Sequence, residues 1–177
     1  MSASELTRMV KVRPLPADPV VVEATEAERA ALASRFGLPC VQSLRAELSL
    51  EQDGKAVLAT GALEAKIVQA CAISGEEFDV TISEPLSLRF VEEGALDPAL
   101  ALDEEIEIEL SPDECDEIEY VGDSFDLGEA VAQSLGLAID PYAEGPNADA
   151  ARKEAGITGD DVPSGPLAEA LKGLKRD

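Results

Sequence analysis

Residues 44–67 read LRAELSLEQDGKAVLATGALEAKI and contain two runs in which apolar and polar side chains alternate. In the first run every second residue is apolar: Leu44, Ala46, Leu48 and Leu50. Such alternation is typical of a strand with one face in a core. Asp53-Gly54 between the runs favours a tight turn, and Gly61 in the second run indicates a bulge or bend. The stretch therefore predicts a β-hairpin with one buried face.

The same period of two continues on both sides of this hairpin. Residues 78–82 alternate after a turn at Ser74-Gly75, and residues 86–90 resume the pattern after Pro85 interrupts it. A short edge strand is expected at residues 20–22, and residues 105–110, EIEIEL, alternate strictly between Glu and apolar side chains. In that last run one face would enter a core while the other would be a row of carboxylates.

Two stretches have helical rather than strand-like spacing. Residues 24–36 begin with a Thr25/Glu28 capping box and end before Gly37. Residues 126–139 begin with an acidic capping box of Asp126 and Glu129, which suits the positive end of a helix. Each stretch predicts one amphipathic helix.

These elements predict an α+β fold. We expect a mainly antiparallel sheet of about five to six strands, which could close into a barrel, with two flanking helices and a flexible C-terminal tail. Residues 1–143 would form a single domain, the Gly-, Pro- and Asp-rich residues 144–165 a flexible linker, and residues 166–177 a short amphipathic peptide.

Charge is distributed very unevenly along the chain. The formal net charge is −23, yet Phe90 to Ala151 contain no lysine or arginine and carry nineteen carboxylates. Such a stretch repels phosphate and attracts cations or basic proteins, although a charge run can also serve only to keep a protein soluble.

Residue types that are missing exclude several classes of function. The chain has no histidine, which excludes Ser-His-Asp and Cys-His catalysis and imidazole metal sites. No Gly-rich phosphate loop is present, and three widely spaced cysteines do not form a disulfide framework. We expect no enzyme activity, no cofactor, no metal and no small-molecule substrate.

The lack of a disulfide framework among the three cysteines fits a protein in a reducing compartment. No apolar run approaches the roughly 20 residues needed to cross a bilayer, so no membrane partner is expected. No signal peptide is visible at the N-terminus. The expected location is the cytoplasm.

Four stretches together resemble the YceD family of large-ribosomal-RNA-subunit accumulation proteins in its alphaproteobacterial form. They read ATEAERAALASRFGL (24–38), LEAKIVQACAISGEEF (63–78), SFDLGEAVAQSLGLAIDPY (124–142) and PSGPLAEALKGLKR (163–176). They occur in the family's order and span nearly the whole chain. The resemblance implies a non-enzymatic ribosome-biogenesis factor that supports accumulation of large-subunit rRNA and has no catalytic residues.

The chain departs from the wider family at one position. Where that family has a central Cys-x-x-Cys pair suited to a metal, Cys71 is followed three positions later by Ser74. A thiolate zinc site needs four ligands. Cys71 is therefore interpreted as a small core residue.

The formal net charge of −23 conflicts with broad electrostatic binding to RNA, because contacts with phosphate need basic residues. One solution is that the acidic half binds a basic ribosomal protein or assembly factor, with Glu105, Glu107 and Glu109 at the centre of the contact. The other is that a small basic surface contacts the rRNA precursor. Its residues would be Arg45, Lys55, Lys66 and Arg89 together with Lys172, Lys175 and Arg176 of the C-terminal peptide. An acidic protein-binding module or chaperone unrelated to ribosomes is the alternative function.

Overall fold

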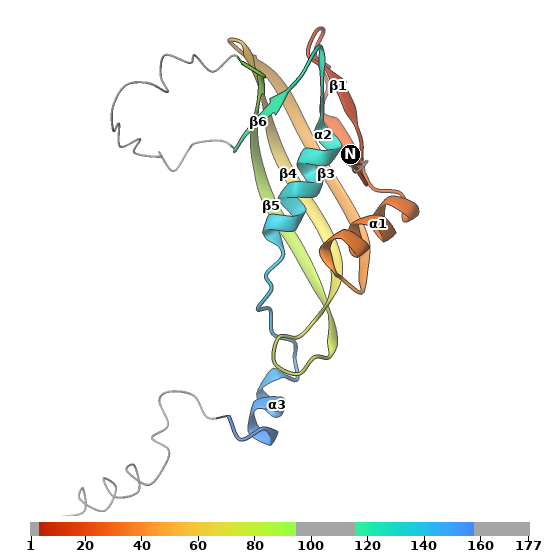
Figure 1. The fold of residues 1–177 in the computed structure, drawn as a ribbon, viewed down its shortest axis with the longest axis vertical. Coiled ribbons are helices and arrows are strands. Elements are labelled where there is room, and N and C mark those ends of the chain that lie inside the picture. The colour runs from red at the N-terminus through yellow and green to blue at the C-terminus, as the bar shows by residue number, and fades with distance from the viewer. Residues whose placement is uncertain (1–3, 95–115, 158–177) are drawn as a thin grey trace, which may run out of the picture. The chain divides into compact units, whose positions relative to one another are not determined.

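The computed structural model describes residues 4–94 and 116–157 (Figure 1). In chain order the elements are β1 (Met9–Lys11), β2 (Val20–Glu23), α1 (Glu26–Phe36), β3 (Cys40–Asp53), β4 (Ala56–Ala70), β5 (Glu77–Glu92), β6 (Asp116–Tyr120), β7 (Ser124–Asp126), α2 (Leu127–Ala138) and α3 (Ala148–Glu154). The fold is α+β, as predicted. Its strands form a five-stranded sheet in the order β2-β3-β4-β5-β6 and a two-stranded sheet of β1 and β7.

The chain divides into two compact units. Unit 1 is the described part of Met1–Gln69 and Asp79–Asp140, and unit 2 is the described part of Ala70–Phe78 and Pro141–Asp177. Unit 1 contains almost all of the sheet together with α1 and α2. Unit 2 contains the turn between β4 and β5 and the segment that carries α3.

The hairpin of β3 and β4 is the centre of unit 1. The two strands pair antiparallel from Cys40↔Val68 to Asp53↔Ala56, with Leu44 opposite Ala65. The alternate apolar residues of β3 are at most 9% exposed, while Arg45, Glu47 and Ser49 between them are exposed. The predicted hairpin and its buried face are confirmed, because one face of the sheet is covered and the other meets water.

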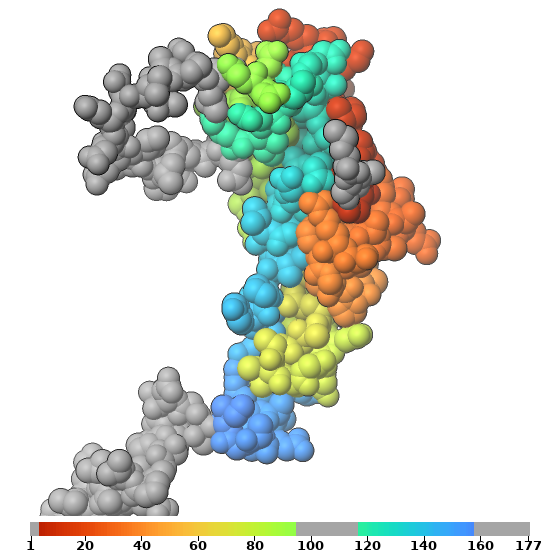
Figure 2. Space-filling view, in the orientation of Figure 1, coloured from red at the N-terminus to blue at the C-terminus, as the bar shows by residue number. Residues whose placement is uncertain are grey.

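Helices α1 and α2 cover that buried face, and the space-filling view shows them in front of the sheet (Figure 2). Leu32 of α1 and Leu127, Val131 and Leu135 of α2 are each 0% exposed in the same core as the strands. The two helices approach closely, since a Cβ on Gly136 of α2 would lie 2.7 Å from the Phe36 ring of α1.

Aromatic side chains gather where β5, β6 and β7 meet the core. The Phe90 and Phe125 rings stack at 4.0 Å between centroids, and Tyr120 lies 6.0 Å from Phe125. These contacts bury three of the chain's few aromatic residues together and join the end of the large sheet to the small one.

The sheet is mixed, because the expected antiparallel pairing holds for β2, β3 and β4 but not for β6. This strand pairs parallel with β5, from Leu88↔Asp116 to Glu92↔Tyr120. A tight turn can only join antiparallel strands, whereas the longer connection between β5 and β6 permits a parallel neighbour. Among the described strands the sheet also does not close into a barrel, because β2 and β6 lie at its two ends.

Two local expectations were also wrong. Pro85 does not split its segment, because β5 runs unbroken through it. Gly61 introduces no bulge, since it stands in regular register opposite Leu48. The register shift of this pair lies instead between Val41 and Ser43.

Unit 2 contains a third helix that the sequence interpretation did not include. Helix α3 lies within residues 144–165, where a flexible linker was expected. Ala72 N donates to Ala143 O at 3.0 Å, and Asn147 Nδ2 donates to Glu76 Oε2 at 2.7 Å. These bonds connect the start of the α3 segment to the β4–β5 turn, a contact between distant residues that composition does not reveal.

Candidate protein-binding surface

The residues chosen from sequence as the centre of binding lie outside the described residues. Glu105, Glu107 and Glu109 fall between β5 and β6, and Lys172, Lys175 and Arg176 follow α3. The described residues nevertheless show which charges are engaged within the fold and which face solvent.

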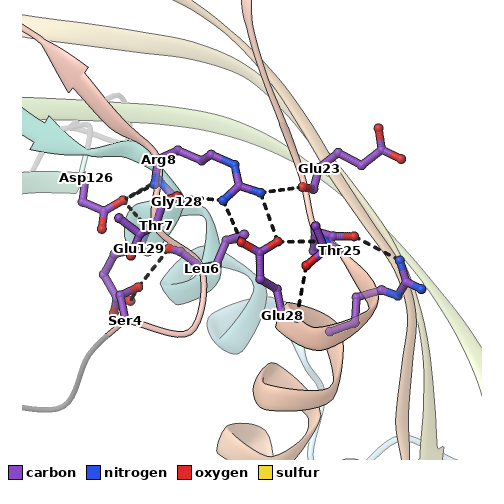
Figure 3. Close-up of polar contacts among 12 residues, drawn as sticks. Ser4, Leu6, Thr7, Arg8, Glu23, Thr25, Glu28, Asp126, Gly128 and Glu129 are labelled. Atoms are coloured by element: carbon purple, nitrogen blue, oxygen red, sulfur yellow. Dashed lines mark hydrogen bonds and ion pairs between the residues drawn. The ribbon is translucent and has the colours of Figure 1, made fainter.

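One cluster of polar contacts joins the N-terminal segment to both helices of unit 1 (Figure 3). The Arg8 guanidinium forms a two-pronged ion pair with the Glu28 carboxylate, at 2.7 and 3.0 Å, and Arg8 also donates to Glu23 O at 2.8 Å. The backbone N–H of Arg8 donates to Asp126 Oδ1 at 2.8 Å. We call this set, with the Arg35 contacts below, the helix clamp.

Both helices have a side-chain N-cap within the clamp. Thr25 N donates to Glu28 Oε2 at 2.7 Å and Glu28 N donates to Thr25 Oγ1 at 3.4 Å, which confirms the capping box of α1. Asp126 caps α2 by accepting from Gly128 N and Glu129 N. Glu129 does not complete the second box, because its carboxylate turns to the arginine described next.

Arg35 holds the other side of the clamp. Its guanidinium donates to both Glu129 carboxylate oxygens, at 3.1 and 2.9 Å, and to Glu5 Oε2 at 2.9 Å. Ser4 Oγ donates to Glu129 Oε2 at 2.6 Å. Arg35 and Glu129 are 94 residues apart, so no local sequence signal could have paired them.

The clamp stabilises the ionised form of its carboxylates. Hydrogen bonding from Arg8 lowers the pKa of Glu28 to about 2, and hydrogen bonding from Arg35 lowers the pKa of Glu129 to about 2, in both cases against partial burial. Both carboxylates are therefore ionised and ion-paired near neutral pH, and neither has a proton to transfer.

Other arginines are paired with carboxylates as well. Arg45 contacts Glu47 at 2.9 Å, Arg89 lies 3.6 Å from both Asp53 and Glu117, and Arg152 of unit 2 pairs with Glu144 and Asp149. Two members of the predicted basic surface, Arg45 and Arg89, are thus engaged. A strongly basic patch for phosphate is correspondingly reduced.

Carboxylates gather where the last residues of β5 run beside β6. The group, here called the acidic rim, comprises Glu92, Glu93, Glu117, Glu119 and Asp123, all exposed. In β6 the apolar partners alternate with them, since Tyr120 is 7% exposed and Ile118 packs against the core. The strand pattern therefore directs Glu117 and Glu119 to solvent.

A hollow of about 500 Å³ lies beside part of the rim. Its lining includes Glu92, Glu93 and Asp123 together with Arg13 and Lys55. Within the described ranges the rim carboxylates outnumber these cations, and only Glu117 of the rim forms an ion pair there. The surface is suited to a positively charged group brought by a partner.

Comparison with known proteins identified no relative. Neither a scan against protein-family models nor searches of curated proteins and of solved structures found a match to this chain. The likeness to the YceD family therefore stands on the four sequence stretches alone.

Cys71 is buried in unit 2, at 3% exposure, but its sulfur is not in purely apolar surroundings. Ile73 N and Ser74 N donate to Cys71 Sγ at 3.4 and 3.3 Å. Hydrogen bonding to Ser74, helped by the N–H groups of Gly145 and Ile73, lowers the pKa of the thiol to about 7 despite burial. Sequence reasoning missed this donor set, because Gly145 is distant in the chain.

Two searches of the described residues bear on metal and membrane. Over residues 4–94 and 116–157, no three Cys, Asp or Glu side chains gather in an arrangement that could hold a metal ion. Likewise, none of the helices there is long and apolar enough to span a membrane.

Proposed function

We propose that this protein is a non-enzymatic, cytoplasmic ribosome-biogenesis factor of YceD type, which supports accumulation of large-subunit rRNA. It would do so by binding a basic ribosomal protein or a precursor particle through its carboxylates. The resemblance of the four stretches supports the ribosomal context, and the charge arrangement supports the kind of partner.

The observation that carries the choice of a basic partner is the unequal engagement of charges. Five of the seven described arginines form ion pairs with carboxylates of the same chain: Arg8, Arg35, Arg45, Arg89 and Arg152. The acidic rim is exposed and belongs to the stretch without lysine or arginine. Association with a basic protein gains from this arrangement, whereas association with phosphate is opposed by it.

The acidic rim alone also favours a second candidate, an acidic protein-binding module or chaperone unrelated to ribosomes. Both candidates bind basic proteins, but only the first associates with precursors of the large subunit. Sedimentation of a cell lysate through a sucrose gradient separates them: a biogenesis factor travels with precursor particles, and an unrelated module stays at the top.

Two variants test the acidic contact in the same gradient. The first neutralises the predicted row, Glu105, Glu107 and Glu109, to Gln; the second neutralises Glu92, Glu93 and Glu119 of the acidic rim. A matched control changes Glu26, Glu51 and Glu64, three exposed carboxylates elsewhere, to Gln. We expect the first two variants to associate less with the particles, and any remaining association to depend less on the salt concentration. The control variant should behave like the wild type. Equal association of all three with the wild type would overturn the acidic contact.

A further inference from the structure

Among the described strands, β5 has neighbours on both sides over only part of its length. It runs from Glu77 to Glu92, but β6 lies beside it only from Leu88 onward. Over residues 79–86 the described strands provide β4 as a neighbour on one side and no strand on the other (Figure 1). As far as the described residues show, alternate N–H and C=O groups along this edge point away from the sheet and can pair with another strand, except at Pro85, which has no N–H.

A shallow groove lies along the same edge and is bounded by the end of α2. Its volume is about 280 Å³, and its lining includes Glu84, Pro85 and Leu86 of β5 and Ser134, Leu137 and Ala138 of α2. Leu137 is 81% exposed on the outer face of α2 and is an apolar side chain available for contact. A strand edge beside a helix end is a geometry that binds extended peptides, with main-chain bonds for affinity and a groove for one side chain.

Charge selects the occupant of this groove. Among the described residues, the lining of the groove includes Glu84 and no lysine or arginine, and Asp79 is exposed farther along β5. Arg45 and Lys66 border residues 81–83 in a separate hollow. A second copy of this chain, at a formal −23, would be repelled. Glu84 adds a negative charge that opposes pairing with an identical acidic edge and attracts a positively charged segment. Pro85 lacks an N–H, so an added strand would form its main-chain bonds on either side of it.

We propose that the open edge of β5 at residues 79–86 and the adjoining α2 groove bind an extended basic segment of a partner protein, which adds a strand to the sheet and places an apolar side chain against Leu137. The proposal rests on the proposed function for the nature of the partner. It specifies where that partner is held and how.

The test uses the full chain and a fluorescent decapeptide of alternating Lys and Val, with binding followed by anisotropy at 0.15 M salt. A second peptide has the same sequence with alternate backbone nitrogens methylated, and a third replaces Lys by Glu. Leu137→Ser removes the exposed anchor, and Val121→Ser is its matched control, because Val121 is 75% exposed in the turn between β6 and β7. Hydrogen exchange reports on the amides of residues 79–86.

We expect the Lys/Val peptide to bind the wild type and the Val121→Ser protein equally, and to slow exchange at residues 79–86. Methylation of the peptide, or Leu137→Ser, should weaken binding about tenfold or more, and the Glu peptide should not bind. Equal binding of the methylated peptide would show plain charge attraction and overturn the proposal. So would unchanged exchange at the edge, or a wild-type dimer that Leu137→Ser dissociates, which would assign the edge to a second copy.

The gradient experiment distinguishes failure of this inference from failure of the proposed function. If Leu137→Ser lost peptide binding but still associated normally with precursor particles, the edge would not be the partner's binding site. The proposed function would be unaffected. A wild type that binds the peptide at residues 79–86 but never travels with precursor particles would refute the ribosomal role and keep the peptide site.

Discussion

Gly61 shows how a single residue sets the distance between two strands. It stands opposite Leu48 in the β3–β4 ladder, and a Cβ built there would lie 1.9 Å from the carbonyl oxygen of Glu47. No real Cβ approaches an oxygen so closely, so any other residue would force the backbones apart. Glycine is needed here for close approach and not for a bulge.

Replacing Gly61 by alanine should therefore destabilise unit 1 by about 2 kcal/mol or more, because the clash is with backbone atoms that cannot rotate away. Denaturant unfolding followed by circular dichroism measures the loss. Thr60→Ala is the matched control, an exposed neighbour in the same strand, with an expected change within about 0.5 kcal/mol. If Gly61→Ala were as stable as the control, the strands would have to separate at no cost, contrary to this account.

At the scale of elements, the helix clamp connects the N-terminal segment, α1 and α2. Glu28 and Glu129 have side-chain exposures of 21% and 27%, so their ion pairs with Arg8 and Arg35 are partly shielded from water. Partly shielded, two-pronged pairs stabilise more than exposed single contacts do. The clamp therefore holds the N-terminal segment, α1 and α2 in place relative to one another.

The lowered pKa values predict how the clamp responds to acid. Both carboxylates have a pKa of about 2 in the folded protein against roughly 4.3 when unfolded. Their stabilisation is therefore complete above about pH 4.3 and is lost as the pH falls through 4 toward 2. Glu129→Gln should cost about 1 kcal/mol at pH 6 and much less at pH 2.5.

Chemical denaturation of both proteins at the two pH values measures this difference. Glu26→Gln, which neutralises an exposed carboxylate in the first turn of α1, serves as the control for lost charge alone. An equal cost of Glu129→Gln at both pH values would indicate that the side chain acts through packing and not through its charge.

At the scale of the whole molecule, the core of unit 1 is assembled from elements that precede residue 140. Its buried cluster draws on both sheets and on α1 and α2. The C-terminal peptide, residues 166–177, carries Lys172, Lys175 and Arg176, a local excess of positive charge in an otherwise acidic chain. This separation suggests that folding and the use of the peptide can be tested independently.

Truncation after Asp161 is expected to leave the melting temperature of the protein within about 2 °C of the wild type and to reduce its association with precursor particles. A Gly/Ser tail of equal length in place of residues 162–177 controls for chain length. Unfolding of the truncated protein would show that the peptide is structural, and undiminished co-sedimentation would show that it is dispensable.

Much of the fold could be predicted from local sequence patterns. The β3–β4 hairpin, the Thr25/Glu28 cap of α1, its Gly37 end and the start of α2 at Asp126 were all predicted and are present. Each depends on residues a few positions apart, whose side chains and dihedral angles act on one another directly. The proposed binding residues at 105–109 and 172–176 lie outside the described residues and remain predictions.

The sequence by itself determined the alternating hairpin, the approximate boundaries of α1 and α2, and the concentration of negative charge between Phe90 and Ala151. Only the tertiary structure decided that β6 lies parallel to β5, that Met9 pairs with Asp126, and that Arg35 is neutralised by Glu129. Periodicity records which face of an element is buried but not which element it meets. Long-range pairing depends on how all the buried faces pack together, and that packing also decides which charges and which strand edge are left facing solvent.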